Sequence, residues 1–108
     1  MEGPMKGEVV VVPFPFSNLS QAKNRPALVL IDLPGADVVL AAITSTGSEP
    51  HSITLELQDF QKGSLSRTSY IHPAKLFTFQ KSLIRNIVGR ISEKKRMEVV
   101  TKIASLLA

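Results

Sequence analysis

Four consecutive valines, Val9 to Val12, constrain the fold of this chain more than any other feature of its sequence. β-Branched side chains favour extended backbone, and an uninterrupted run of them is typical of a strand buried on both faces. We expect this strand to cover residues 8–12, opened by Gly7 and ended by Pro13, because proline cannot donate a hydrogen bond to a central ladder.

Further short strands are predicted between segments rich in turn and loop residues. Pro34 and Gly35 indicate a turn, so the strands on either side of them should form a hairpin. The expected strands cover residues 27–32, 38–45, 53–57, 69–75 and 87–90. Residues 17–24, 46–51 and 61–67 are expected to be connecting segments, and residues 81–85 one short helical turn.

The end of the chain changes to a helical period. Ser92 is a suitable N-cap, and Glu93 is well placed in the first helical turn. Apolar residues at helical spacing then predict one buried face: Met97, Val100, Ile103, Ala104 and Leu107. Short strands followed by one terminal helix predict a mainly β protein, a small antiparallel barrel with a C-terminal helix packed on it.

Composition excludes several classes of function. The 108 residues suffice for a single domain, and we expect residues 1–6 to form a flexible tail. The absence of cysteine excludes disulfides and thiol nucleophiles, and two histidines are too few for a three-ligand catalytic metal site. We therefore expect neither a metal nor another cofactor. Without a membrane-length apolar run or a signal-peptide pattern, the expected location is the cytoplasm.

The charge is compatible with a polyanionic partner. Thirteen Lys and Arg against nine Asp and Glu give a net charge of +4, and the pI is about 9.7. Nucleic acid is the first candidate for such a partner. Many small basic domains bind nothing charged, however, so the charge alone leaves the question open.

Several blocks of sequence carry a family resemblance. Residues 7–20 read GEVVVVPFPFSNLS and residues 23–30 read KNRPALVL, followed by AAITS at 41–45, SYI at 69–71, KLFT at 75–78 and GRIS at 89–92. In order and spacing these blocks resemble the MazF/PemK-type toxins, the endoribonucleases of type II toxin–antitoxin systems. The likeness spans nearly the whole chain, and its first block is the most specific part.

The resemblance implies an SH3-like antiparallel barrel of the MazF/CcdB type and a homodimer. It also implies that the protein is an mRNA interferase, which cleaves single-stranded RNA selectively by sequence. A cognate antitoxin, whose acidic or extended tail occupies the RNA groove, is the implied partner. In such toxins the active pair is the arginine before the proline and the threonine that ends the Ala-Ile-Thr strand, which here are Arg25 and Thr44.

These residue types suit metal-free RNA cleavage, in which the 2′-hydroxyl attacks the adjacent phosphate. The reaction needs a base, an acid and positive charge near the phosphorane. Arg25 offers a fork of donors to phosphate oxygens, and a side chain that stays protonated near neutral pH favours a charge clamp and proton donor over a base. Thr44 is able to bind a phosphate oxygen or to orient the reacting hydroxyl. An ordinary strand threonine is the alternative, and Ser45 or Thr46 could share the role.

The chain departs from the family pattern after the Ser-Tyr-Ile block. Where many relatives carry an arginine and an acid, this sequence has His72 and Ala74. The missing acid weakens a mechanism with a carboxylate base. His72 is a candidate third catalytic residue, because imidazole titrates near neutral pH. A surface histidine beside a proline is the alternative.

Five further residues are candidates for RNA contact. The lysines and polar groups near the active pair are suited to phosphate and base contacts, and an aromatic ring at the loop entrance is suited to base stacking, although burial of that ring is equally plausible. These candidates are Lys23, Asn24, Ser45, Phe16 and Lys75. Phe14 has the same two alternatives as Phe16, and His51 is a structural residue or a minor RNA contact.

A non-catalytic reading also remains open. The same barrel could be a binding module for nucleic acid or antitoxin, either as a degenerate toxin or as a relative that poisons gyrase. Ala74, in place of the acid, keeps the degenerate version open, whereas nothing in the sequence favours the gyrase version.

Overall fold

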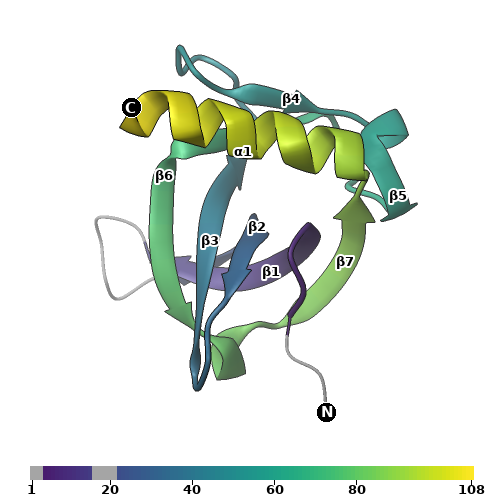
Figure 1. Ribbon diagram of the computed structural model, residues 1–108. Coiled ribbons are helices and arrows are strands. Elements are labelled where there is room, and N and C mark those ends of the chain that lie inside the picture. Colours follow the sequence, from purple (N-terminus) through teal and green to yellow (C-terminus); the bar gives the residue numbers. More distant parts are fainter. Residues whose placement is uncertain (1–3, 16–21) are drawn as a thin grey trace.

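The computed structural model describes residues 4–15 and 22–108 as a curled antiparallel sheet with one terminal helix (Figure 1). The described elements are β1 (Glu8–Pro15), β2 (Ala22–Asp32), β3 (Asp37–Thr44), β4 (Ile53–Leu55), η1 (Leu57–Asp59), β5 (Phe60–Gly63), β6 (Ser69–Gln80), η2 (Lys81–Leu83), β7 (Asn86–Ile91) and α1 (Glu93–Leu107). The strand order is β4-β6-β3-β2-β1-β7-β5. The predicted fold class, mainly β with a C-terminal helix on a small barrel, is confirmed.

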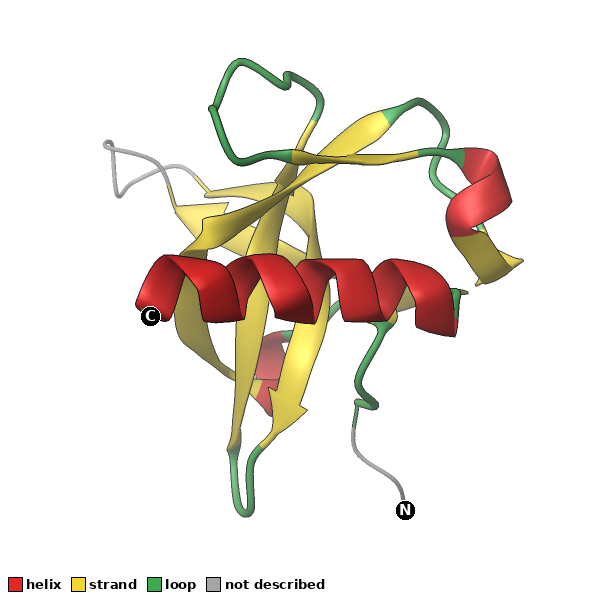
Figure 2. Cartoon of the chain, turned by 45° about the horizontal axis from the view of Figure 1, so that its top comes forward, coloured by secondary structure: helices red, strands yellow, loops and turns green. Residues whose placement is uncertain are grey.

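The valine run lies in an interior strand of this sheet, between β2 and β7, and its buried side chains lie on both faces, as expected. Val9 belongs to a cluster that includes Val99 of the helix, whereas Val10 and Val12 belong to a second cluster on the other face. Side chains alternate between the two faces of a strand, so consecutive valines supply both clusters. Figure 2 shows α1 lying across one side of the strands.

Pro13 does not end the first strand, contrary to expectation. The Val11 carbonyl accepts a hydrogen bond from the Arg85 N–H on the β7 side, and alternate residues point their backbone groups to the same side. The nitrogen of Pro13 therefore points to the β7 side, where β7 pairs with β1 only as far as Val11. No ladder bond is lost, and β1 continues to Pro15.

The second strand begins at Ala22, earlier than predicted. Residues 22–24 were expected to be a loop because they are polar, but they pair with β1 in continuous register from Pro15↔Ala22 to Val12↔Arg25. This stretch forms a two-stranded ribbon without a third strand beside it, so its composition can stay polar. The expected β2–β3 hairpin is confirmed, with Ala27 opposite Ala42.

The later strands differ from prediction mainly at their ends. The fourth strand stops at Leu55, and the side chain of Leu57 is 71% exposed in a 3-10 turn. β5 was not predicted, because a short edge strand with mostly exposed side chains has no apolar alternation to reveal it. β6 runs on to Gln80, and the helical turn expected over 81–85 is η2.

The terminal helix begins as predicted, but its buried face only partly matches the predicted one: Ile103 packs against the core as expected, and Val99 does so in place of Met97. The Ser92 hydroxyl accepts a hydrogen bond from the Lys95 N–H at 3.1 Å. Lys95 also donates to the Thr54 carbonyl at 3.0 Å, which fixes the first turn of the helix against β4. Val99, one turn further along, is consequently fully buried, whereas Met97 of the predicted face is 46% exposed.

The described part of the chain contains no helix that is both long and apolar enough to cross a bilayer. Of the expected N-terminal tail, residues 1–3 lie outside the described residues. Pro4 is buried, and the Met5 N–H donates to the Glu8 carboxylate at 2.7 Å.

We expect Val99→Ala to lower the free energy of unfolding by about 2 kcal/mol, because it leaves a cavity between α1 and the sheet. Met97→Ala, on the exposed face of the same helix, should change it by less than about 0.5 kcal/mol. Urea denaturation of both variants measures the difference. Equal losses would contradict the observed helix orientation.

Candidate functional site

The site forms where β2 parts from β3. Val29 directs its carbonyl to the β1 side, where it accepts from the Gly7 N–H, so the nitrogen of Pro26 points to the β3 side. Proline has no N–H to give, and the β2–β3 ladder ends at Ala27↔Ala42. Arg25 and Thr44 each lie two residues beyond this last pair, so both point to the same face of the sheet.

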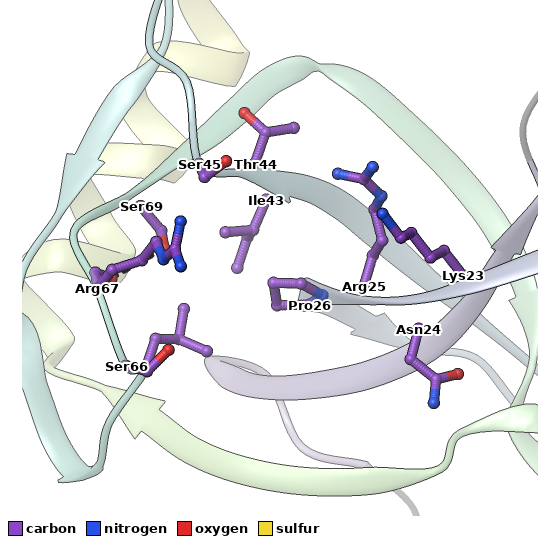
Figure 3. Close-up of a pocket in the computed structure, with 11 residues that line it drawn as sticks. Lys23, Asn24, Arg25, Pro26, Ile43, Thr44, Ser45, Ser66, Arg67 and Ser69 are labelled. Carbon is purple, nitrogen blue, oxygen red and sulfur yellow. Dashed lines mark hydrogen bonds between the residues drawn. The ribbon is translucent and has the colours of Figure 1, made fainter.

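A polar cleft of about 480 Å³ lies on one side of this pair (Figure 3). Lys23 and Arg25 come from β2, and Arg67 reaches in from the opposite wall on the segment between β5 and β6. The other described lining residues are Asn24, Pro26, Ile43, Thr44, Ser45, Leu65, Ser66 and Ser69. None of the described lining residues is acidic, so three cations make this cleft suitable for an anion.

A second, mainly apolar cleft of about 390 Å³ lies on the other side. It shares Arg25, Pro26, Ile43 and Thr44 with the polar cleft. Its remaining described lining residues are Val12, Phe14, Ala42, Lys75, Leu76 and Phe77. The rings of Phe14 and Phe77 lie 5.0 Å apart, which gives this cleft an aromatic wall. The two clefts together form a groove with Arg25 and Thr44 between a cationic end and an aromatic end.

Thr44 is held from behind by a histidine. The Thr44 hydroxyl oxygen lies 2.6 Å from His72 Nε2 and 2.8 Å from the Thr46 carbonyl. His72 is only 3% exposed and lines neither cleft. Burial lowers the pKa of His72, Lys75 lowers it further, and Glu49 opposes them. The imidazole is therefore neutral at pH 7 and reaches the groove only through Thr44.

The other predicted contact residues are distributed unevenly. Lys23 and Ser45 line the polar cleft, as does Asn24, although its amide points away from Arg25 in Figure 3. Lys75 lines the apolar cleft, where its ammonium is 3.2 Å from the Glu49 carboxylate. Phe16 lies outside the described residues.

His51 and Ala74, the two remaining positions that the sequence singled out, are both exposed. His51 is exposed in the segment between β3 and β4, and lines neither cleft. Ala74, where relatives carry an acid, is exposed on β6. Glu49 approaches this region through its ion pair with Lys75.

Sequence reasoning missed Arg67. It lies in a polar segment that was expected only to connect two strands, and nothing in that segment distinguishes it from the other twelve basic residues. Its position comes from tertiary packing: Leu65 packs against the core, and the Ser69 hydroxyl donates to the Arg67 carbonyl at 3.1 Å. These contacts hold the segment so that Arg67 faces Arg25 across the cleft.

The described residues contain no group of three or more His, Asp or Glu side chains that could hold a metal ion. The absence of a metal requirement remains a prediction.

The fold and site define a small curled-sheet protein with a partly cationic groove at the open end of its central hairpin. The family model described as "PemK-like, MazF-like toxin of type II toxin-antitoxin system" matches residues 5–107. The chain belongs to this family. Among curated proteins, no sequence matches the chain significantly.

Solved structures show the same fold. MazF from Deinococcus radiodurans has a TM-score of 0.76 at 22% identity, covering 99% of this chain and 98% of its own. A MazE–MazF structure from the same organism has a TM-score of 0.77 at 20% identity, covering 98% and 97%. An endoribonuclease from a mycobacterial species, in complex with its cognate antitoxin, has a TM-score of 0.76 at 19% identity, covering 96% and 94%.

The lowered pKa of His72 predicts a loss of stability in mild acid. Below the ordinary histidine value of about 6.5 the unfolded chain takes up a proton that the folded protein does not, so unfolding becomes easier as pH falls. The loss stops growing once pH drops below the folded pKa. We expect His72→Gln to remove this part of the dependence between pH 7.5 and 5.5 in urea denaturation. An unchanged slope in the variant would contradict the assignment.

Proposed function

We propose that this protein is the endoribonuclease toxin of a toxin–antitoxin pair and that it cleaves single-stranded RNA without a metal. The observation that carries the proposal is the placement of Arg25 and Thr44 between a cationic cleft and an aromatic one. Membership of the PemK/MazF toxin family supports it, as do similar structures that are described as endoribonucleases.

The two clefts suit the two parts of a single RNA strand. Phosphates are anionic, and the cations of Lys23, Arg25 and Arg67 attract them. Unpaired bases stack on aromatic rings, and Phe14 and Phe77 offer such a surface. A strand laid along the groove therefore places a phosphodiester near Arg25 and Thr44. Selectivity for particular bases would come from the aromatic end.

Cleavage proceeds by attack of the 2′-oxygen on the adjacent phosphorus, with departure of the 5′-oxygen. The products are a 2′,3′-cyclic phosphate and a 5′-hydroxyl, and the 2′ proton passes to a base while the 5′-oxygen gains one. Arg25 stabilises the added negative charge through its fork of donors. Because a guanidinium stays protonated near neutral pH, arginine is a clamp and a proton donor rather than the base.

An antitoxin with an acidic or extended tail is the partner that fits the cationic cleft. Two of the similar toxins have structures with MazE or with a cognate antitoxin. Such a tail would compete with RNA for Lys23, Arg25 and Arg67. Homodimer formation remains an expectation from the family.

Purified protein should cleave a mixed RNA pool in EDTA and leave 2′,3′-cyclic or 3′-phosphate ends. Arg25→Ala should reduce the rate at least about 100-fold, because the phosphorane loses its main cation. Arg25→Lys tests charge without the fork, and Arg85→Ala, between η2 and β7 and outside the described lining of both clefts, is a control. All four proteins should unfold at similar temperatures.

A single deoxyribose 5′ to the scissile phosphate should block cleavage at that site, since the nucleophile is absent. Efficient cutting of this substrate would refute the 2′-hydroxyl mechanism. Tight binding of RNA without any product, over many sequences, would instead support the non-catalytic alternative that Ala74 leaves open.

Arg67→Ala should weaken binding of a deoxy-substituted, uncleavable RNA by about tenfold and reduce the slope of log affinity against log salt by about 0.7, the value for one phosphate contact on a single strand. Arg85→Ala removes the same charge at a residue that lines neither cleft and should leave the slope unchanged. Fluorescence anisotropy at four salt concentrations measures both. Identical slopes for the two variants would show that Arg67 makes no phosphate contact.

A further inference from the structure

Resting on the proposed function, we propose that His72 is a positioning residue that holds the Thr44 hydroxyl as a hydrogen-bond acceptor toward the RNA. Thr44 would then accept a hydrogen bond from the attacking 2′-hydroxyl, and would not donate one to a phosphate oxygen. This assigns a role to a histidine that lies behind the groove, outside both clefts.

The contacts of the Thr44 hydroxyl determine which hydrogen bond it donates and which it accepts. A hydroxyl has one proton and two lone pairs, and a carbonyl oxygen only accepts. At 2.8 Å from the Thr46 carbonyl, the hydroxyl must place its single proton there. The contact with His72 Nε2, 2.6 Å away, then needs a proton from the histidine. Nε2 must therefore be protonated and donate a hydrogen bond to the Thr44 oxygen.

This arrangement fixes the histidine tautomer. A neutral imidazole carries its proton on one ring nitrogen only, so protonated Nε2 leaves Nδ1 bare. Burial and the neighbouring Lys75 keep the ring neutral against the opposing influence of Glu49. A neutral donor also leaves the Thr44 oxygen more basic than an imidazolium would.

One lone pair of Thr44 then remains for the substrate. With its proton on the Thr46 carbonyl, the hydroxyl has nothing to donate to a phosphate oxygen. It can still accept from a ribose hydroxyl, which orients the nucleophile without removing its proton fully. Charge stabilisation consequently falls to Arg25, and the two members of the pair have different functions.

The fold builds this arrangement from three segments. The β3–β6 register passes from Ala41↔Leu76 to Ile43↔Ile71, so Ala42 alone faces a bulge of β6 at residues 72–75. His72 begins this bulge, directly after the pair Ile43↔Ile71, and its Nε2 reaches the Thr44 hydroxyl. A Cβ at Gly47 would lie 2.6 Å from the Tyr70 ring, so the loop after β3 packs tightly on that ring and fixes the Thr46 carbonyl.

The tautomer is directly measurable. Long-range ¹H–¹⁵N spectra of the wild-type protein at pH 7.5 should show His72 with a protonated Nε2 and a bare Nδ1. Thr44→Val, which removes only the hydroxyl, should give a mixture of tautomers, and Thr44→Ser should restore the wild-type signal. A dominant protonated Nδ1 in the wild-type protein would overturn the proposal, because Thr44 would then donate to His72.

Kinetics separate positioning from a merely structural role. His72→Leu should lower kcat about 10- to 100-fold, the effect of a misplaced reacting group, and leave the affinity for uncleavable RNA within about twofold. His72→Gln, which keeps an N–H near the place of Nε2, should recover most of the loss. In a Thr44→Val background His72→Leu should have no further effect.

Two results would contradict the proposal: full activity of His72→Leu, or the same proportional loss in the Thr44→Val background. Should His72→Leu fail to fold, the comparison of His72→Gln with wild-type protein and the tautomer of Thr44→Val decide the matter. Should the wild-type protein cleave no RNA, the proposed function fails, while the tautomer measurement still tests the Thr44–His72 assignment.

Discussion

The end of the β2–β3 ladder at Pro26 is the constraint on which the site depends. The missing N–H of this proline lies on the β3 side, so the two strands separate after Ala27↔Ala42 while β2 stays paired with β1. Arg25 and Thr44 are left facing each other at the opening. Moving Pro26 along the strand would move the opening, because the ladder would close over one side of the groove.

The two clefts of the groove lie on different sides of the Arg25–Thr44 pair and differ in chemistry. The cluster that contains Val10 and Val12 continues into the aromatic cleft, whereas the polar cleft lies beside Ile43 and the segment that carries Arg67. In the proposed function, the phosphates and the bases of an RNA strand would therefore contact different surfaces. Arg25 and Thr44 belong to both, and a reacting phosphodiester between them would be in contact with each end of the groove.

The buried contacts behind the groove fix the orientation of the Thr44 hydroxyl. A lone threonine hydroxyl can turn about its χ1 bond and act as donor or acceptor. Here the Thr46 carbonyl and His72 fill two of its three hydrogen-bonding directions, at the cost of burying a neutral imidazole. The same burial links the integrity of the site to the stability of the fold in mild acid.

Local sequence determined much of this protein. The valine run, the Pro34–Gly35 hairpin and the Ser92 cap follow from side-chain shape and backbone hydrogen bonding within a few residues. The Arg-Pro motif predicted Arg25 as a site residue, and Arg25 lines both clefts. Only the tertiary structure decided which face of α1 is buried, that Arg67 reaches the cleft, and that His72 stands behind Thr44. Each of these depends on contacts between residues far apart in the chain, at a packing angle, a loop anchor or a bulge, which no local pattern encodes.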